Sequence, residues 1–356
     1  MDVQRTGRFR LAGTFAAVAI TLLATSCGGG SDDAAGSPST APSSLAPPTT
    51  ADPVVAPTTA PRPTSTSPPP TTQRPSPTST TVAPTTSTTT TTSPPQPRPT
   101  AEVDELVSVG GPRLHVRCTG SGPSTVLLIH GFTGDHTSFA GIEPQVAQMS
   151  RVCSYDRFGT GSSDPPPAPQ TFATQAHDLR NALTALGEPG PFVVVGHSFG
   201  GDVAVTFTSL YRSEVAGLLL LEASPWNWNS TVCSVADDGS ASAEIWVQTC
   251  SMQAGPASNV EGIDGPAAFA ELAQIGSLGD IPMIVDTASV HDYTAPDFDP
   301  AVAAGLTEAW FAGQDHWASL SSNSQVVHVD NAGHNVHVDQ PELVIEQITE
   351  LLSPLS

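Results

Sequence analysis

The tract from residue 28 to residue 101 constrains this chain more than any other feature, because it cannot form a core. It holds 18 of the 35 prolines and long runs of threonine and serine, and it contains no Phe, Trp or Tyr. Without apolar area to offset the entropy of ordering, it is expected to stay disordered, partly in polyproline II, as an extended spacer. Such tracts also accept O-glycans in exported proteins, and an unmodified tether is the alternative.

Residues 1–27, ahead of this spacer, have the pattern of an export signal. Three arginines precede an apolar run over 11–24, which is shorter than the roughly 20 residues needed to span a membrane. The segment 23–27 (LATSC) resembles a bacterial lipobox, whose cysteine is lipidated. We therefore expect an exported lipoprotein held at the outer face of the cell membrane by a lipid anchor on Cys27, with plain secretion as the alternative.

The charged residues exclude several classes of function. The chain has 34 acidic residues against 12 basic ones, a net charge of -22, and every basic residue is arginine. The absence of lysine excludes a Schiff-base lysine and a phosphate-binding lysine. A nucleic-acid partner is not expected, because affinity for a phosphate backbone depends largely on clustered cations.

The remaining residues, 102–356, are expected to form one folded domain with four cysteines, Cys118, Cys153, Cys233 and Cys250. An even number of cysteines in an exported chain predicts two disulfides, whose connectivity the sequence alone does not give. Their spacing is unlike that of a zinc site, which typically has closely paired cysteine ligands.

Short apolar runs recur along this domain and predict buried strands. They cover 114–118, 125–130, 152–155, 192–196, 217–221, 281–285 and 325–329. Runs of this length that are apolar on both faces suit a sheet covered on both sides. A helical pattern over 174–186 lies between two of them, so the fold class is α/β, with a mainly parallel central sheet and helices on both faces. The alternation stops over about 224–279, where we expect a cap inserted above the carboxyl end of the sheet.

A glycine-flanked serine lies where one predicted strand meets the following helix. The strand 192–196 runs into Gly196-His197-Ser198-Phe199-Gly200, which has the Gly-x-Ser-x-Gly pattern. Small residues beside Ser198 permit the sharp turn that lifts a nucleophilic hydroxyl above the sheet. This context predicts a nucleophile elbow rather than an ordinary tight turn.

Three further motifs, together with this one, make the domain resemble the α/β-hydrolase family over essentially all of residues 102–356. His130-Gly131-Phe132 follows a strand and is similar to the family's oxyanion-hole turn. Residues 155–164 (YDRFGTGSSD) are similar to its Asp-Arg-x-Gly-x-Gly-x-Ser loop, and 332–341 (AGHNVHVDQP) resembles the loop that carries the catalytic histidine. The motifs also occur in the family's order.

The resemblance implies a role for each of these residues. Ser198 is the nucleophile and His334 its general base, with His337 as the nearby rival. A metal site at these two histidines is not expected, because no further ligand accompanies them at a suitable spacing. The backbone N–H groups of Phe132 and Phe199 are the expected oxyanion-hole donors.

The acid of the triad has two candidates. After the strand 281–285 the family usually places an aspartate, and here Asp292 follows one residue late, while Asp286 ends the strand itself. Glu222 follows the strand 217–221 directly, where a subset of the family places its acid. Glu222 is the preferred candidate because an unpaired charge at that buried strand end would be costly, and Asp292 is the alternative.

The family fold also implies the disulfide pairing and the function. Strands that hold Cys118 and Cys153 are neighbours in it, so these two are expected to pair, which leaves Cys233 with Cys250 in the cap. The implied function is a serine hydrolase that cleaves a carboxylic ester, or an amide, of a small-molecule or lipid-like substrate without a metal or organic cofactor. The alternative is a catalytically inactive hydrolase fold that serves as a binding protein of the cell envelope. The sequence indicates no oligomeric state.

Overall fold

The computed structural model describes residues 99–228, 230–231, 233, 250–289 and 300–355. These residues all lie in one compact unit, within Ser87–Ser356. The predicted export signal with Cys27, nearly all of the spacer, part of the cap and Asp292 lie outside the described residues. None of the described helices is both long enough and apolar enough to cross a membrane.

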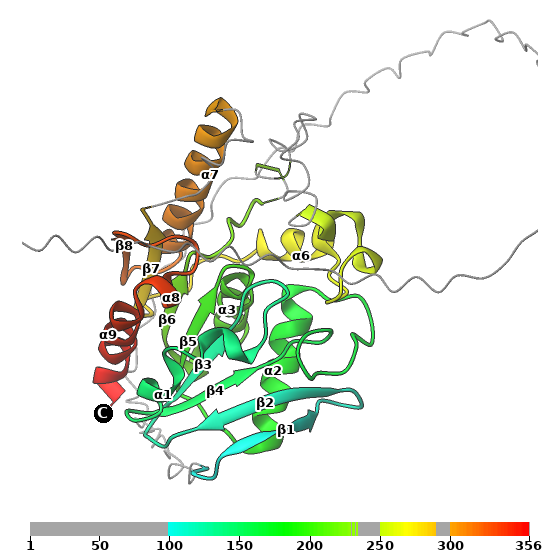
Figure 1. Ribbon diagram of the computed structural model, residues 1–356, viewed down its shortest axis with the longest axis vertical. Helices are drawn as coiled ribbons and strands as arrows, with labels where there is room; N and C mark the ends of the chain where they lie inside the picture. The colour runs from blue at the N-terminus through cyan, green and yellow to red at the C-terminus, as the bar shows by residue number, and fades with distance from the viewer. Residues whose placement is uncertain (1–98, 229, 232, 234–249, 290–299, 356) are drawn as a thin grey trace, which may run out of the picture. The chain divides into compact units, whose positions relative to one another are not determined.

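Eight strands form one mixed sheet in the order β1-β2-β4-β3-β5-β6-β7-β8 (Figure 1). Their bounds are Val103–Ser108 (β1), Arg113–Thr119 (β2), Thr125–Ile129 (β3), Arg151–Tyr155 (β4), Phe192–His197 (β5), Val215–Leu221 (β6), Met283–Ala288 (β7) and Ser324–Val329 (β8). The strand β2 pairs antiparallel with both β1 and β4, and every pairing from β4 to β8 is parallel. The sheet is therefore mainly parallel, as the sequence predicts.

Helices cover both faces of this sheet. They are α1 (Glu143–Val146), α2 (Phe172–Leu186), α3 (Phe199–Leu210), α6 (Gly265–Leu272), α7 (Pro300–Ser319), α8 (Val336–Asp339) and α9 (Pro341–Leu352). Side chains alternate between two hydrophobic clusters along β5, because Val194 packs with residues of α2 and α3 while Val193 and Val195 pack with residues of α1 and α9. This alternation is the reason that the strand reads as a continuous apolar run.

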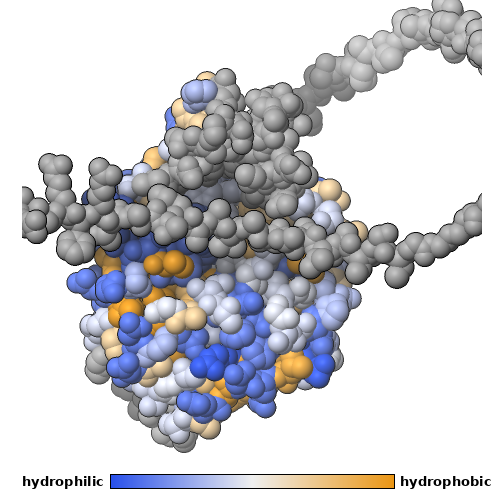
Figure 2. All heavy atoms as spheres, viewed as in Figure 1, coloured by the Kyte–Doolittle hydropathy of each residue, from blue (hydrophilic) through white to orange (hydrophobic). Residues whose placement is uncertain are grey.

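All seven predicted apolar runs correspond to strands of the sheet, and the missed strand is β1. Its sequence VDELVS is mostly exposed, because it lies at the edge of the sheet, so it has no apolar run. The strand β7 begins at Met283 rather than at Ile281, because Pro282 cannot donate a ladder hydrogen bond. On the face drawn in Figure 2, hydrophobic residues of the described surface are scattered among hydrophilic ones.

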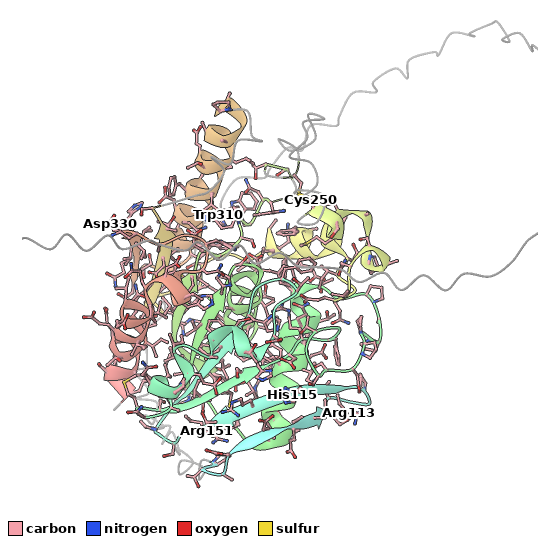
Figure 3. The ribbon with its side chains drawn as sticks, in the orientation of Figure 1. Arg113, His115, Arg151, Cys250, Trp310 and Asp330 are labelled. Carbon is pink, nitrogen blue, oxygen red and sulfur yellow. A yellow bond between two sulfur atoms is a disulfide. The ribbon has the colours of Figure 1, made fainter. Side chains whose placement is uncertain are left out.

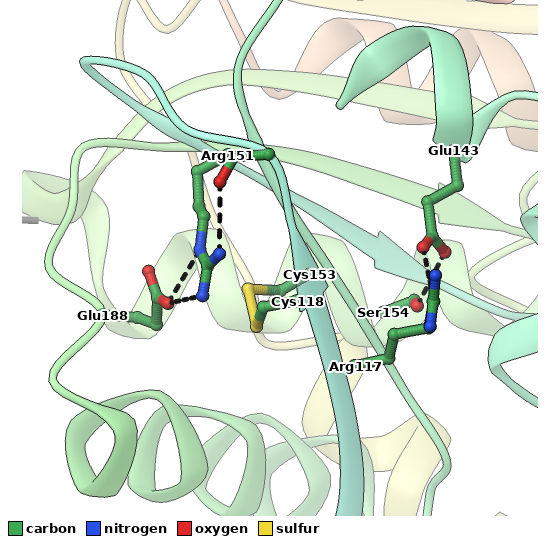
Figure 4. The surroundings of a disulfide bond; sticks show 8 residues. Arg117, Cys118, Glu143, Arg151, Cys153, Ser154 and Glu188 are labelled. Carbon is green, nitrogen blue, oxygen red and sulfur yellow. Dashed lines mark hydrogen bonds and ion pairs between the residues drawn. A yellow bond between two sulfur atoms is a disulfide. The ribbon is translucent and has the colours of Figure 1, made fainter. Parts of the chain in front are cut away.

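Both predicted disulfides are present in the structure. Cys118 and Cys153 are direct partners across the β2–β4 ladder, and their sulfur atoms are bonded (Figure 4). Cys233 is bonded to Cys250 within the cap. The first disulfide joins two core strands, and the second closes a loop of the cap.

Candidate active site

Ser198 lies at a sharp turn between β5 and α3. Its backbone has φ 52° and ψ -127°, a conformation that L-residues rarely adopt, and its N–H donates to the Leu221 carbonyl at 3.0 Å. Glycine is required two residues after Ser198, because a Cβ on Gly200 would lie 2.2 Å from the Ile129 carbonyl oxygen. The predicted elbow is therefore built by close packing of α3 against the end of β3.

His334 lies in the loop after β8 and is brought to the elbow through His197. The Nε2 of His197, the residue before Ser198, donates to the His334 carbonyl at 2.9 Å, and the two rings lie 4.9 Å apart. The His334 side chain is 46% exposed, so it can reach a substrate. Among the described residues, no hydrogen bond joins the Ser198 hydroxyl to the His334 ring; such bonds often tighten only when substrate binds.

His337, the rival base, is packed inside the domain. Its ring lies 4.9 Å from that of Phe139 and 4.6 Å from that of His197. Burial lowers the pKa of His337 to about 4, so the ring is neutral near pH 7. This position indicates a structural role for His337 and leaves His334 as the accessible imidazole.

Within the described part of the chain, Glu222, which follows β6, places its carboxylate against His334. Its Oε2 lies 3.5 Å from the Nδ1 of His334, and its Oε1 accepts the Ala288 N–H at 2.6 Å. Glu222 is fully buried and has a φ of 49°, so the backbone bends sharply after β6 to present this side chain. The structure thus brings Glu222 and His334 together, while Asp292 lies outside the described residues.

Asp286 lies near Glu222, and the pKa of its carboxyl is raised. Burial raises the pKa of the Asp286 carboxyl to about 7, the hydrogen bond from Gln347 opposes the shift, and the nearby Glu222 charge adds to it. The Nε2 of Gln347 donates to its Oδ1 at 2.7 Å. The prediction that Asp286 ends its strand is wrong: β7 continues to Ala288, so Asp286 lies inside the strand, where the Gln347 side chain from α9 binds its carboxyl.

The predicted oxyanion-hole donors come from two adjacent segments. The rings of Phe132 and Phe199 lie 5.6 Å apart, and a Cβ on Gly131 would lie 3.4 Å from the Cβ of Ser198. Among the described residues, the N–H groups of Phe132 and Phe199 have no hydrogen-bond partner. Two unpaired donors beside the Ser198 turn are the kind of groups that an oxyanion hole requires.

A buried ion pair that the sequence did not predict holds the loop that carries Phe132. The Arg157 guanidinium binds both oxygens of Glu261, with Nε to Oε2 at 2.7 Å and Nη2 to Oε1 at 3.0 Å. The neighbouring Asp156 accepts the backbone N–H groups of His136 and Ser162 and so binds loop backbone. Glu261 belongs to the cap and carries no motif that could have identified it.

Two groups of side chains have the residue types of a metal site. Ligand atoms of His115, His136 and Asp156 lie within 4.8 Å of one another. The Asp156 carboxylate accepts hydrogen bonds from two backbone N–H groups and from the His136 Nδ1 at 2.8 Å. Most of its hydrogen-bonding capacity is therefore used in fixing the loops around it. In the second group, with Glu188, the sulfur atoms of Cys118 and Cys153 are bonded to each other and are not available as ligands. Both groups are explained by structural roles.

Aromatic side chains pack close to His334. Trp310, which projects from α7 (Figure 3), has its ring 5.4 Å from that of His334 and 5.5 Å from that of Trp228. Trp226 packs against His316 at 4.8 Å, and Trp246 lies outside the described residues. No sequence motif singles out Trp310 as a neighbour of His334.

Comparison with known proteins agrees with this arrangement. Residues 124–236 match the family model described as alpha/beta hydrolase fold. An uncharacterized protein of Mycobacterium tuberculosis is 37% identical over 116 residues, which are 33% of each chain. Lipase LipV of the same species is 36% identical over 133 residues, 37% of this chain and 46% of the lipase. Each match thus spans less than half of the relative's own length.

A solved structure extends the likeness to the whole folded part. A thermophilic esterase from Thermogutta terrifontis superposes with a TM-score of 0.50 at 24% identity, covering 72% of this chain and 98% of the esterase. The folded part therefore has the α/β-hydrolase fold.

Proposed function

We propose that the chain is a serine hydrolase that cleaves a carboxylic ester, or an amide, through an acyl-enzyme on Ser198. The observation that carries this proposal is the contact between the buried Glu222 carboxylate and the Nδ1 of His334, beside a strained serine elbow. A carboxylate in that place holds the imidazole with its Nε2 free to accept a proton and stabilises the imidazolium that follows.

The reaction follows from this geometry. His334 takes the hydroxyl proton as the Ser198 oxygen attacks the substrate carbonyl, and the N–H groups of Phe132 and Phe199 bind the resulting oxyanion. Glu222 stabilises the His334 imidazolium, which then gives its proton to the leaving alcohol or amine, and the acyl group stays on Ser198. Water then adds to the acyl group while His334 takes a proton from it. The imidazolium returns this proton to the Ser198 oxygen as the bond from that oxygen to the acyl carbon breaks, which releases the carboxylic acid and restores Ser198.

Apolar aromatic walls support a small-molecule or lipid-like ester as the substrate. The Trp310 ring lies 5.4 Å from that of His334 and 5.5 Å from that of Trp228, and the Phe132 ring packs beside that of Phe199. Aromatic side chains bury apolar groups of a ligand without requiring charge on it. Every step of the proposed reaction uses groups of this chain, so we propose no cofactor.

We also propose that the enzyme is exported and held at the outer face of the cell membrane through a lipid on Cys27, with secretion as the alternative. Two disulfides in the folded part support an oxidising compartment, because cytosolic thiols are usually kept reduced. Mass analysis of the N-terminal fragment from a native membrane fraction tests the anchor: an unmodified Cys27, or cleavage elsewhere, contradicts it.

Labelling with a fluorophosphonate tests the proposed function. We expect the wild-type chain to be labelled on Ser198, and Ser198→Ala to lose the label. Ser353→Ala, which changes an exposed serine after α9, is the matched control and should label like the wild type. A wild-type chain that is folded but not labelled contradicts the proposal and supports an inactive, ligand-binding hydrolase fold.

A further inference from the structure

The buried pair of Arg157 and Glu261 lies where it can control the oxyanion hole. We propose that these two side chains are positioning residues that aim the Phe132 N–H at the reacting carbonyl. This inference rests on the proposed function. It means that a residue of the cap, Glu261, helps to position an oxyanion-hole donor.

The first step of the argument concerns the peptide group that carries the Phe132 N–H. The carbonyl of Gly131 and the N–H of Phe132 are opposite ends of one planar peptide. The Nη2 of Arg157 donates to that carbonyl at 2.7 Å, and Nη1 donates to the His130 carbonyl at 2.5 Å. Because the peptide is rigid, a hydrogen bond that fixes its carbonyl also fixes the direction of its N–H. A charged donor on the carbonyl also polarises that N–H.

The second step concerns the other side of Phe132. The Thr133 N–H donates to the Oε1 of Glu261 at 2.7 Å. Thr133 has a φ of 59°, which is unfavourable for a β-branched residue and persists only where neighbouring groups enforce it. Phe132 is therefore held from both sides, by Arg157 through the preceding carbonyl and by Glu261 through the following N–H.

The third step is the burial of the pair. The side chains of Arg157 and Glu261 are 1% and 0% exposed, and the guanidinium lies over the Phe199 ring at 5.1 Å from its centroid. Removing one charge leaves the other buried without its partner, which is costly, so the loop would shift to bring in water or another group. Such a shift moves the same peptide that presents the oxyanion donor.

The fourth step shows that Glu261 cannot move independently of the loops around it. A Cβ on Gly159, in the loop after β4, would lie 2.0 Å from the Val260 carbonyl oxygen. The Gln170 N–H donates to the Gly262 carbonyl at 2.8 Å. The cap segment around Glu261 is therefore packed directly on the loop that supplies Arg157.

The chain contains a matched control for this pair. Arg151 and Glu188 form a second fully buried ion pair, with contacts of 2.7 and 3.0 Å (Figure 4). Arg151 is the first residue of β4, so this pair lies at the amino end of the parallel strands, whereas Ser198 follows the carboxyl end of β5. Loss of either pair should destabilise the fold, but only the first should affect catalysis.

The experiment compares Glu261→Gln with Glu188→Gln in the full mature chain, with p-nitrophenyl butyrate as substrate. We expect Glu261→Gln to lower kcat about 100-fold with little change in KM, which is the lower end of the cost of losing one oxyanion-hole donor. A trifluoromethyl ketone, which forms an oxyanion on the serine, should lose affinity by a similar factor. Glu188→Gln should keep kcat within about threefold of the wild type while its melting temperature falls, because its pair does not contact the oxyanion loop.

Equal effects of the two substitutions on kcat, or a Glu261→Gln enzyme with unchanged kcat, would overturn the inference. If Glu261→Gln does not fold, Glu261→Asp is the second variant, because it keeps the negative charge on a shorter side chain. Glu261→Asp should lower kcat and the affinity for the trifluoromethyl ketone together. A folded Glu261→Asp enzyme with wild-type values of both overturns the inference. A wild-type chain that is not labelled on Ser198 instead contradicts the proposed function itself. The two failures are therefore distinguishable.

Discussion

Replacing Glu222 by glutamine should nearly abolish turnover while leaving the shape of the site intact. In the wild type the donors to the carboxylate include the Ala288 N–H at 2.6 Å and the His334 Nδ1 at 3.5 Å. A glutamine has one oxygen and one NH₂ group, so it can accept from only one of them. The shorter contact to Ala288 should take the oxygen, because a buried NH₂ group facing an N–H would leave two donors unpaired at a cost of about 1–3 kcal/mol each.

The tautomer of His334 in Glu222→Gln determines how much kcat should fall. The NH₂ group of Glu222→Gln then faces the Nδ1 of His334, which must accept a hydrogen bond and so carries its proton on Nε2. That tautomer cannot take the Ser198 proton. The same change in a serine protease costs on the order of 10⁴ in kcat, which corresponds to about 5.5 kcal/mol in the activation free energy.

The assay is the hydrolysis of p-nitrophenyl esters of graded acyl length, with Asp292→Asn as the matched control. We expect Glu222→Gln to fall by about 10⁴ in kcat and Asp292→Asn to stay close to the wild type. A Glu222→Gln enzyme within tenfold of the wild type, beside an Asp292→Asn enzyme that has lost most activity, would refute the assignment. Small and equal effects would show that neither side chain is the acid.

Three further predictions test the fold. Burial raises the pKa of the Asp286 carboxyl to about 7, so between about pH 4 and 7 the folded chain keeps a proton that the unfolded chain releases. The contribution of Asp286 to the free energy of unfolding should therefore fall by about 4 kcal/mol over this pH range. In urea titrations, Asp286→Asn should flatten that fall. Replacing both Cys118 and Cys153 by alanine should cost about 4 kcal/mol, from the loop entropy of their separation of 35 residues, and an unchanged urea midpoint would contradict this. Gly200→Ala should prevent folding or activity, because its Cβ would lie 2.2 Å from a backbone oxygen, whereas Gly141→Ala, whose Cβ meets nothing within 4 Å, should melt like the wild type.

Most of the sheet is predictable from the sequence, because strands buried on both faces leave continuous apolar runs. The edge strand β1 is not, since its residues VDELVS face mostly solvent and follow no such run. Ser198 and His334 are also predictable, because each lies within a local motif. Both roles stay predictions until the labelling and kinetic experiments are done.

The remaining parts of the site depend on contacts between distant segments. Glu222 and Asp292 both follow strands that end at the same edge of the sheet, so the sequence alone leaves the acid open, and only the approach of Glu222 to His334 favours one of them. Glu261 binds Arg157 across 104 positions of the chain, and nothing near either residue marks them as partners. Trp310 likewise reaches His334 only because α7 packs beside β7 and β8.

The disulfide between β2 and β4 has a mechanical consequence. If Cys27 tethers the chain, any pull on the enzyme enters through the spacer at β1, the outermost strand. An edge strand without a covalent cross-link can be pulled away pair by pair, but the disulfide from Cys118 to Cys153 would stop such unfolding at the second strand. The strands that carry the proposed nucleophile and acid would thus be shielded from load.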